Sequence, residues 1–309
     1  MARTYAKPHG SNLGQSIKKN RIFYIMLLPV ILYYLIFCYG PMAGIVVGFQ
    51  NYMPRRGILG SEWVGTRHFQ LLFGSADFHM ILRNTLLLSL YKIVFGFPAP
   101  IVLALMINEI NNRHFKKVVQ TVSYMPHFLS WVIVAKLVSI MLELDGPLNQ
   151  LLSIFGLEPQ QFLINRGMSR GILVAAGIWK EVGWGTLIYL AAIAGINPSL
   201  YESALLDGAT RWKQTIYITI PSILPTIIVM LVLRMGTVMS AGYEDVLLLQ
   251  NNMTYDVLET IDTFVYKTGL QNANYSFATA VGIFKSIVSV AAVLITNFIA
   301  DRATGSSLL

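Results

Sequence analysis

The chain has 309 residues, of which 55% are hydrophobic and only 12% are charged, and its formal net charge is +8. So small a charged fraction is unusual for a soluble domain of this length and predicts an integral membrane protein. A basic excess would favour nucleic acid as a partner of a soluble protein, but basic residues also gather beside the cytoplasmic ends of membrane helices, so we expect no nucleic-acid partner.

The N-terminal segment, residues 1–21, is polar and carries five Lys or Arg side chains. The apolar run that follows, 22–49, is longer than the apolar core of a secretory signal peptide, which spans about 7 to 15 residues. We therefore expect a tail over 1–21 and a first membrane helix over 22–49, because about 20 apolar residues cross a bilayer. Five further runs of spanning length follow, at 84–108, 118–142, 171–196, 222–242 and 277–299.

The distribution of basic residues predicts the orientation. With the N-terminus in the cytoplasm, the cytoplasmic segments hold eleven Lys or Arg residues and the external loops hold seven. Basic residues are retained on the cytoplasmic side, so both the tail at 1–21 and the tail at 303–309 are expected there. The external loops, 50–83, 143–170 and 243–276, are then expected to form a shaped outer surface. Kinks are expected in the second span, at Pro98 and Pro100, and in the third, at Pro126.

A polar segment, 197–221, separates the fourth and fifth spans. Its sequence from Tyr201 onward reads YESALLDGATRWKQTIYITIP, which predicts two short helices with a turn between them. Gly208 allows the backbone to bend there, and Pro221 is expected to start the next helix. The segment resembles the EAA loop of the membrane subunits of ABC importers. The positions that carry this resemblance and the expected contact with an ATPase are Glu202, Ser203, Ala204, Asp207, Gly208, Ile218 and Pro221.

The resemblance to carbohydrate importers continues outside this segment. The first external loop carries Phe49-Gln50-Asn51-Tyr52 and leads into Asn84-Thr85-Leu86, and a later stretch reads Tyr275-Ser276-Phe277-Ala278-Thr279-Ala280. These motifs are similar to those of maltose-type importers and of the LplB-type polysaccharide and oligosaccharide permeases. The resemblance implies an all-α permease domain over residues 22–302, with six transmembrane helices and a cytoplasmic coupling loop, in a bacterial cytoplasmic membrane.

The same resemblance implies the partners and the cofactors. We expect a second, similar permease subunit, two ATPase subunits or domains below, a solute-binding protein outside, and an oligosaccharide as substrate, all in a lipid bilayer. No cofactor is expected on this chain, and ATP and Mg²⁺ are expected on the ATPases. The phosphate-loop pattern G-x-x-x-x-G-K-S/T is absent from the sequence, and the histidines lack the i, i+4 spacing of a helical zinc site.

Ionisable residues inside the predicted spans point to the substrate path, since such groups are costly in hydrocarbon and usually face a cavity or a partner. They are Lys92, Lys136, Lys180, Glu181, Arg234 and Lys285. Five bases and one acid leave a formal excess of +4, and carboxylates on the substrate would offset it. An anionic oligosaccharide is therefore one interpretation. Snorkelling lysines, or acids on a partner permease, are the others.

The resemblance implies that the fourth and fifth spans line the sugar site. Glu181 and Trp184 recur at helical spacing on one face of the fourth span, and Trp184 is a candidate for stacking on a sugar ring. The candidate substrate-path residues are Lys180, Glu181, Trp184, Arg234, Thr237 and Ser240.

Two other functions are left open. An ion-coupled secondary transporter would show broken helices in symmetric halves, and no internal repeat is visible in the sequence. A membrane-embedded hydrolase is suggested only by the pair Ser89 and Lys92, which has the spacing Ser-x-x-Lys.

Overall fold

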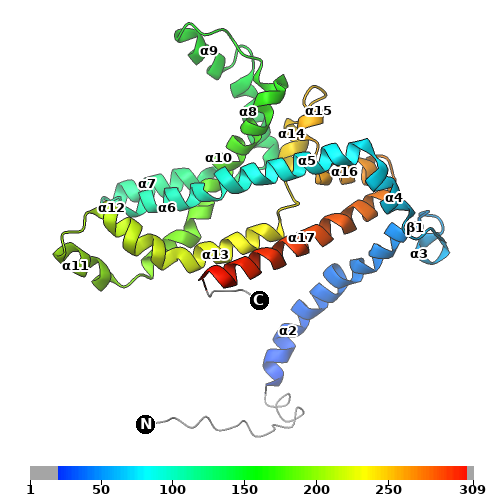
Figure 1. Ribbon diagram of the computed structural model, residues 1–309, viewed down its shortest axis with the longest axis horizontal. Coiled ribbons are helices and arrows are strands. Elements are labelled where there is room, and N and C mark those ends of the chain that lie inside the picture. The colour runs from blue at the N-terminus through cyan, green and yellow to red at the C-terminus, as the bar shows by residue number, and fades with distance from the viewer. Residues whose placement is uncertain (1–19, 305–309) are drawn as a thin grey trace.

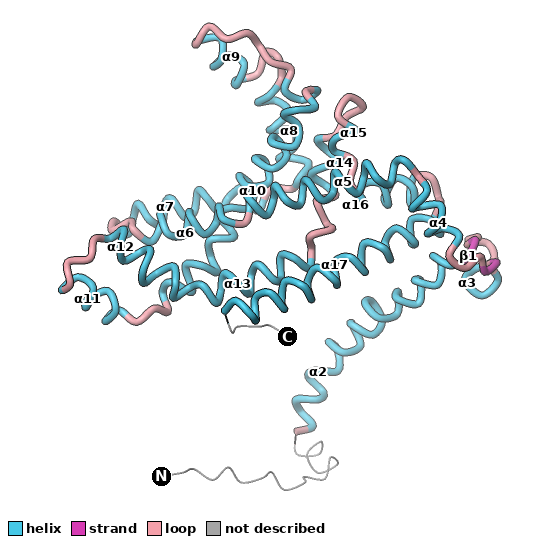
Figure 2. Tube along the Cα trace, in the orientation of Figure 1, coloured by secondary structure: helices cyan, strands magenta, loops and turns pink. Residues whose placement is uncertain are grey.

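The computed structural model describes residues 20–304, which are almost entirely helical (Figures 1 and 2). Within this range, five helical runs are long and apolar enough to cross a membrane: Arg21–Phe49, Ala76–Asn108, Arg166–Ala194, Arg211–Gly236 and Tyr275–Ile299. A sixth candidate is a bent pair, Arg113–Phe128 and Trp131–Ile154, whose axes differ by 104°. The prediction of an all-α polytopic protein is confirmed, and four of the six predicted spans lie in continuous helical runs. The predicted fifth span, 222–242, is wrong at its end, because the helix stops at Gly236.

The first half of the chain builds two of these runs and a small hairpin. The first run comprises α2 (Arg21–Tyr33), a π-helical stretch (Tyr34–Tyr39) and a 3₁₀ stretch (Gly40–Phe49). Strands β1 (Gln50–Asn51) and β2 (Glu62–Trp63) pair antiparallel around α3 (Gly57–Gly60), and α4 (Arg67–Gly74) follows. The second run comprises α5 (Ala76–Tyr91), a π-helical turn (Lys92–Gly96) and α6 (Pro98–Asn108).

The predicted third span is wrong as a single straight helix. Helix α7 (Arg113–Tyr124) passes into a 3₁₀ turn (Met125–Phe128) that contains Pro126, and α8 (Trp131–Leu142) leaves in a new direction, followed by α9 (Pro147–Ile154). Proline has no backbone N–H and its ring crowds the preceding turn, so the helix ends there. Pro98 instead lies in the first turn of α6, where a missing N–H costs little, and the second run stays in one piece.

The second half begins with a 3₁₀ turn (Phe162–Ile164) and the long helix α10 (Arg166–Ala194). Helix α11 (Pro198–Leu206) leads to a run formed by α12 (Arg211–Gln214), a π-helical turn (Thr215–Thr219) and α13 (Ile220–Gly236). Three short helices follow, namely α14 (Glu244–Leu249), α15 (Tyr255–Leu258) and α16 (Ile261–Tyr266). A π-helical turn (Lys267–Gln271) then precedes α17 (Tyr275–Thr304).

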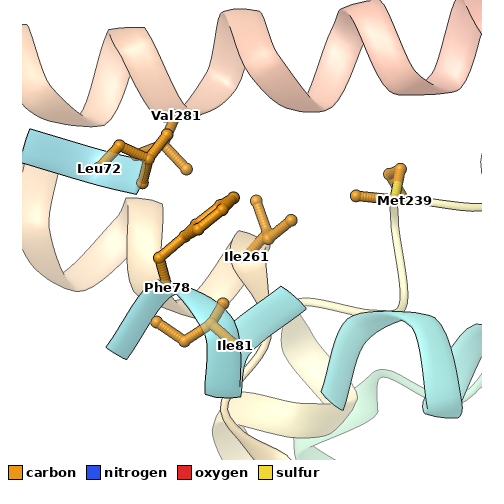
Figure 3. Packing of buried hydrophobic residues seen from close by; sticks show 6 residues of the cluster. All are labelled: Leu72, Phe78, Ile81, Met239, Ile261 and Val281. Atoms are coloured by element: carbon orange, nitrogen blue, oxygen red, sulfur yellow. The ribbon is translucent and has the colours of Figure 1, made fainter. Parts of the chain in front are cut away.

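Two opposite ends can be distinguished in the bundle (Figure 1). The α11 end also holds the turn between α6 and α7, because Arg211 of α12 forms an ion pair with Glu109 at 3.3 Å. The hairpin end holds β1, α3 and α4, and there the Tyr52 backbone N–H donates to the Ser276 hydroxyl at 2.9 Å. A buried cluster near the hairpin end joins α4, α5, α16, α17 and the segment after α13 (Figure 3): Leu72, Phe78, Ile81, Met239, Ile261 and Val281.

The predicted external loop 243–276 is not only an outer surface. Helix α14 packs against α8 and α10, and Asp245 in its first turn is buried. This loop therefore supplies side chains to the interior of the bundle, which the division into spans and loops did not anticipate.

Helix α10 is the centre of the bundle because it packs against α6, α7 and α13. Its glycines allow a close approach: a Cβ atom on Gly183 would lie 1.9 Å from the carbonyl oxygen of Ser123 in α7. Small residues at helix contacts have this role in membrane proteins.

We expect Gly183→Ala to destabilise the folded protein, because the new methyl group collides with backbone that cannot rotate away. Overpacking of this kind costs about 1–3 kcal/mol. Gly171→Ala in the same helix is the matched control, since nothing lies within 4 Å of a Cβ atom there. Thermal unfolding of the purified protein in detergent measures the effect, and equal melting temperatures for the two variants would contradict the close contact.

Candidate functional site

A cavity of about 1100 Å³ lies between the second run, α10, α13 and the segment that follows α13. Five of the six predicted substrate-path residues line it: Glu181, Trp184, Arg234, Thr237 and Ser240. They come from two helices and one non-helical segment. Helical spacing accounts for Glu181 and Trp184 on one face of α10, whereas Thr237 and Ser240 lie beyond the end of α13. Lys92, which the sequence analysis named among the ionisable residues inside the spans, also lines it, together with Trp131, Glu244 and Asp245, which the sequence did not suggest.

Lys180 does not line the cavity. Its side chain is buried, and its Nζ donates to the backbone carbonyl oxygen of His127 at 2.7 Å and lies 3.4 Å from a carboxylate oxygen of Glu181. His127 belongs to the 3₁₀ turn that ends α7, where the chain bends and a carbonyl group loses its helical partner. Lys180 thus lies outside the cavity lining and contacts the break between α7 and α8, and its role in the substrate path stays a prediction.

Trp184 is part of an aromatic stack. The rings of His127 and Trp184 are parallel within 3° with centroids 4.5 Å apart, and His127 Nδ1 lies 2.8 Å from Glu181 Oε2. The stack fixes the orientation of Trp184, whose side chain remains 43% exposed. The sequence analysis missed His127, and the only signal for it was its place directly after Pro126.

Arg234 lies in the last turn of α13 and is exposed toward the cavity. Its position near a helix C-terminus favours a positive charge. Within residues 20–304, the side chain of Arg234 forms no ion pair with an acidic residue. Thr237 and Ser240 follow it in a segment that is no longer helical, and both are exposed.

Most of the intramembrane lysines have partners inside this chain, so the formal excess of +4 is wrong as a count of unpaired charge. Lys92 Nζ lies 2.6 Å from Asp245 Oδ2, and Lys285 forms an ion pair with Asp262. Both acids belong to the predicted external loop 243–276, which the count of charges inside the spans left out. Lys136 is exposed on α8.

The second candidate site is the coupling segment, which we define as residues 197–221. The predicted pair of short helices with a turn between them is confirmed as α11 and α12. Gly208 has a φ of +72°, and the backbone N–H groups of Gly208 and Ala209 donate to the carbonyls of Leu205 and Ala204. This double hydrogen bond is the Schellman motif, in which glycine ends a helix without strain.

The polar members of the coupling segment face outward. Glu202, Ser203 and Asp207 are exposed, and nearby Leu206 has 91% of its surface exposed. Pro221 lies in the first turn of α13, as predicted, and the π-helical turn that contains Ile218 joins α13 to α12 in one run from Arg211 to Gly236. Ala204 and Ile218 are half-buried, and Pro221 is exposed. The segment therefore presents a surface at the α11 end that combines apolar, acidic and basic side chains.

Within the described residues, no group of three or more His, Cys, Asp or Glu side chains is arranged to hold a metal ion. The arrangement can bind and orient a polar ligand through Arg234, Trp184 and the hydroxyl groups of Thr237 and Ser240. Its geometry is that of a binding cavity with a separate exposed contact surface.

Comparison with known proteins places the chain among transport proteins. A family model described as binding-protein-dependent transport system inner membrane component matches residues 96–305. The polygalacturonan/rhamnogalacturonan transport system permease protein YteP of Bacillus subtilis strain 168 is 46% identical over 285 residues, covering 92% of this chain and 89% of that protein. Protein LplB of the same organism is 41% identical over 288 residues, covering 93% and 91%.

Two solved structures are also similar. One comes from a bacterial ABC transporter involved in the import of the acidic polysaccharide alginate, with a TM-score of 0.88 and 45% identity over 95% of this chain and all of the matched chain. The other comes from a bacterial alginate ABC transporter in complex with an alginate pentasaccharide-bound periplasmic protein. Its TM-score is 0.89 at 44% identity, over 96% of this chain and 100% of that chain.

We expect Lys180→Met to destabilise the protein, because it leaves the carbonyl of His127 without a donor, and an unsatisfied buried polar group costs about 1–3 kcal/mol. Lys180→Arg, which keeps a donor and a positive charge, is expected to retain most of the stability. Lys136→Met is the matched control at an exposed lysine of α8. If Lys180→Met and Lys136→Met had the same melting temperature in detergent, Lys180 would not stabilise the break.

Proposed function

The chain belongs to the family of binding-protein-dependent transport system inner membrane components, and on this premise we propose that it moves anionic oligosaccharides into the cytoplasm. It is a multi-pass membrane protein and a permease subunit of an ABC importer for polysaccharides or oligosaccharides. It acts with ATPase and solute-binding partners. The predicted carbohydrate permease function is confirmed over the ion-coupled transporter and the membrane hydrolase.

Arg234 is the observation that carries the proposal of an anionic substrate. It is the cavity-lining base for which the described part of the chain provides no acidic partner, whereas Lys92 is neutralised by Asp245. A guanidinium without an acidic partner can form charge-assisted hydrogen bonds with a ligand that brings a carboxylate. Glu244 lies on the same cavity, so the total charge of the lining does not select an anion by itself. The similar transporter for the acidic polysaccharide alginate supports the same assignment.

The other lining residues suit a carbohydrate. Trp184 offers an exposed part of an aromatic ring whose orientation the stack with His127 fixes, and amphipathic aromatic rings pack against the apolar faces of ligands. Hydroxyl groups of Thr237 and Ser240 can exchange hydrogen bonds with sugar hydroxyls. Glu181, held by His127, can accept hydrogen bonds from them. Each of these contacts is part of the proposal.

The proposed assembly contains a second, similar permease subunit, which would close the cavity from the open side. Two ATPase subunits would bind the coupling segment and carry ATP and Mg²⁺, and this chain would bind no cofactor. The coupling segment, with both termini, would face the cytoplasm of a bacterial cell. Closure of the ATPases would then move α11 and rock the bundles, which opens the cavity alternately to the two sides.

We expect Arg234→Gln to lower kcat/KM for a charged oligosaccharide about tenfold, which corresponds to the loss of one charge-assisted hydrogen bond of about 1.5 kcal/mol. Uptake of a uronate oligosaccharide is compared with uptake of a neutral oligosaccharide of equal length in proteoliposomes, and Lys136→Gln is the control. Equal transport of both ligands by the wild type, with equal effects of Arg234→Gln on both, would show that the substrate is not selected by charge.

We expect Glu202→Arg and Gly208→Asp to abolish coupled transport while folding and membrane insertion remain normal. Both positions are exposed, and aspartate tolerates the left-handed backbone conformation of Gly208 better than most residues. Glu158→Arg, at an exposed acid outside the coupling segment, is the control. The measurement is the stimulation of ATP hydrolysis by loaded binding protein. If either variant showed wild-type stimulation, the coupling segment would not couple ATP hydrolysis to transport.

A further inference from the structure

The chain between α13 and α14, Thr237–Tyr243, is not helical although it directly follows a membrane-spanning helix and lines the cavity. We call this irregular segment, which is not a β-strand, the hinge strand. Its Met239 and Ala241 side chains are buried, whereas Thr237 and Ser240 are exposed. Non-helical backbone at membrane depth is tolerated only where its polar groups are satisfied or where it lines a water-filled cavity. The partners of its backbone carbonyls therefore matter.

Two residues one helical turn apart on α5 and its end satisfy this requirement. The Ser89 hydroxyl donates to the carbonyl oxygen of Val238, and Lys92 Nζ donates to the carbonyl oxygen of Ala241 at 2.5 Å. Their i, i+3 spacing on a helix matches two carbonyls that are three residues apart in the hinge strand. We call these two hydrogen bonds to the backbone the clamp. They account for the Ser-x-x-Lys pattern, which the sequence analysis had connected with a membrane hydrolase.

Asp245 completes the clamp. Its carboxylate lies 2.6 Å from Lys92 Nζ, and both side chains are largely buried. The same carboxylate occupies the space beside Gly242: a Cβ atom there would lie 2.1 Å from Asp245 Oδ1, and the φ of Gly242 is +120°. Asp245 is itself held in place because α14 packs against α8 and α10. The hinge strand is therefore tied to α5 on one side and to α14 on the other.

We propose that Ser89, Lys92 and Asp245 are positioning residues for the substrate. By fixing the backbone of the hinge strand, they place Thr237 and Ser240 and hold the end of α13, where Arg234 lies, in the geometry that binds the glycan. This proposal rests on the proposed function in taking the cavity as the substrate site. None of the three needs to contact the sugar, and their effect on affinity acts through the backbone.

The experiment uses the complete transporter, purified with its partners and reconstituted in proteoliposomes. The main variant is the double replacement Lys92→Met/Asp245→Leu, because replacing both members of a buried ion pair with apolar residues is tolerated far better than removing one. Transport of tetragalacturonate gives KM and kcat. Labelling of Ser240→Cys by a membrane-impermeant maleimide, with Cys38→Ser to remove the only native thiol of this chain, is read on this chain after separation from its partners and reports the freedom of the hinge strand without any substrate.

If the clamp positions the substrate, the double variant assembles normally, its KM rises about tenfold with kcat within about threefold, and the thiol introduced by Ser240→Cys is labelled several times faster. Wild-type KM together with wild-type labelling overturns the proposal, as does a loss of kcat alone. If the double variant fails to assemble, Ser89→Ala decides, since it removes one hydrogen bond only: raised KM and faster labelling support the clamp, and unchanged values refute it.

The failure of the proposed function would look different. A wild-type complex that does not transport tetragalacturonate counts against the anionic substrate. The rates at which the introduced thiol is labelled, with the clamp intact and with the clamp replaced, still test the clamp in that case, because labelling requires no ligand.

Discussion

The structure depends on one constraint: in hydrocarbon, every backbone polar group needs a partner inside the protein. Continuous helices meet it by themselves, but this chain breaks at two places, after Pro126 and along the hinge strand. At each break, a lysine from a neighbouring run donates to a backbone carbonyl that has no helical partner. Lys180, which is buried, donates to His127, and Lys92, which is partly buried, donates to Ala241. The lysines that looked like substrate ligands are in this way part of the scaffold.

The breaks also create the cavity. The bend between α7 and α8 brings His127 onto Trp184, and the end of α13 turns the chain from a helix into the hinge strand. A long segment between α13 and α17 then supplies the acids that neutralise Lys92 and Lys285, so both ion pairs are intramolecular. Arg234 remains as the cavity-lining base without an acidic partner in the described chain, and a selective contact to an anionic sugar can be built on it.

Much of this was predictable from the sequence, and the reasons are physical. Run length and hydropathy predict the membrane helices, and the turn chemistry of Gly208 predicts the end of α11. Helical periodicity placed Glu181 and Trp184 on one face, and the structure confirms that both line the cavity. The pairings were not predictable, because Lys92 and Asp245 are 153 residues apart and local patterns carry no information on such contacts. The direction of the bend at Pro126 likewise depends on its packing against α10.

The central claim is that the intramembrane lysines hold the two helix breaks and leave Arg234 to bind the substrate. An experimental structure of the assembled transporter with a bound uronate oligosaccharide tests it most directly. The account predicts a ligand carboxylate within hydrogen-bonding distance of the Arg234 guanidinium, while Lys92 and Lys180 keep their contacts with the carbonyls of Ala241 and His127. A carboxylate bound to Lys92 or Lys180, with those backbone contacts broken, would contradict it.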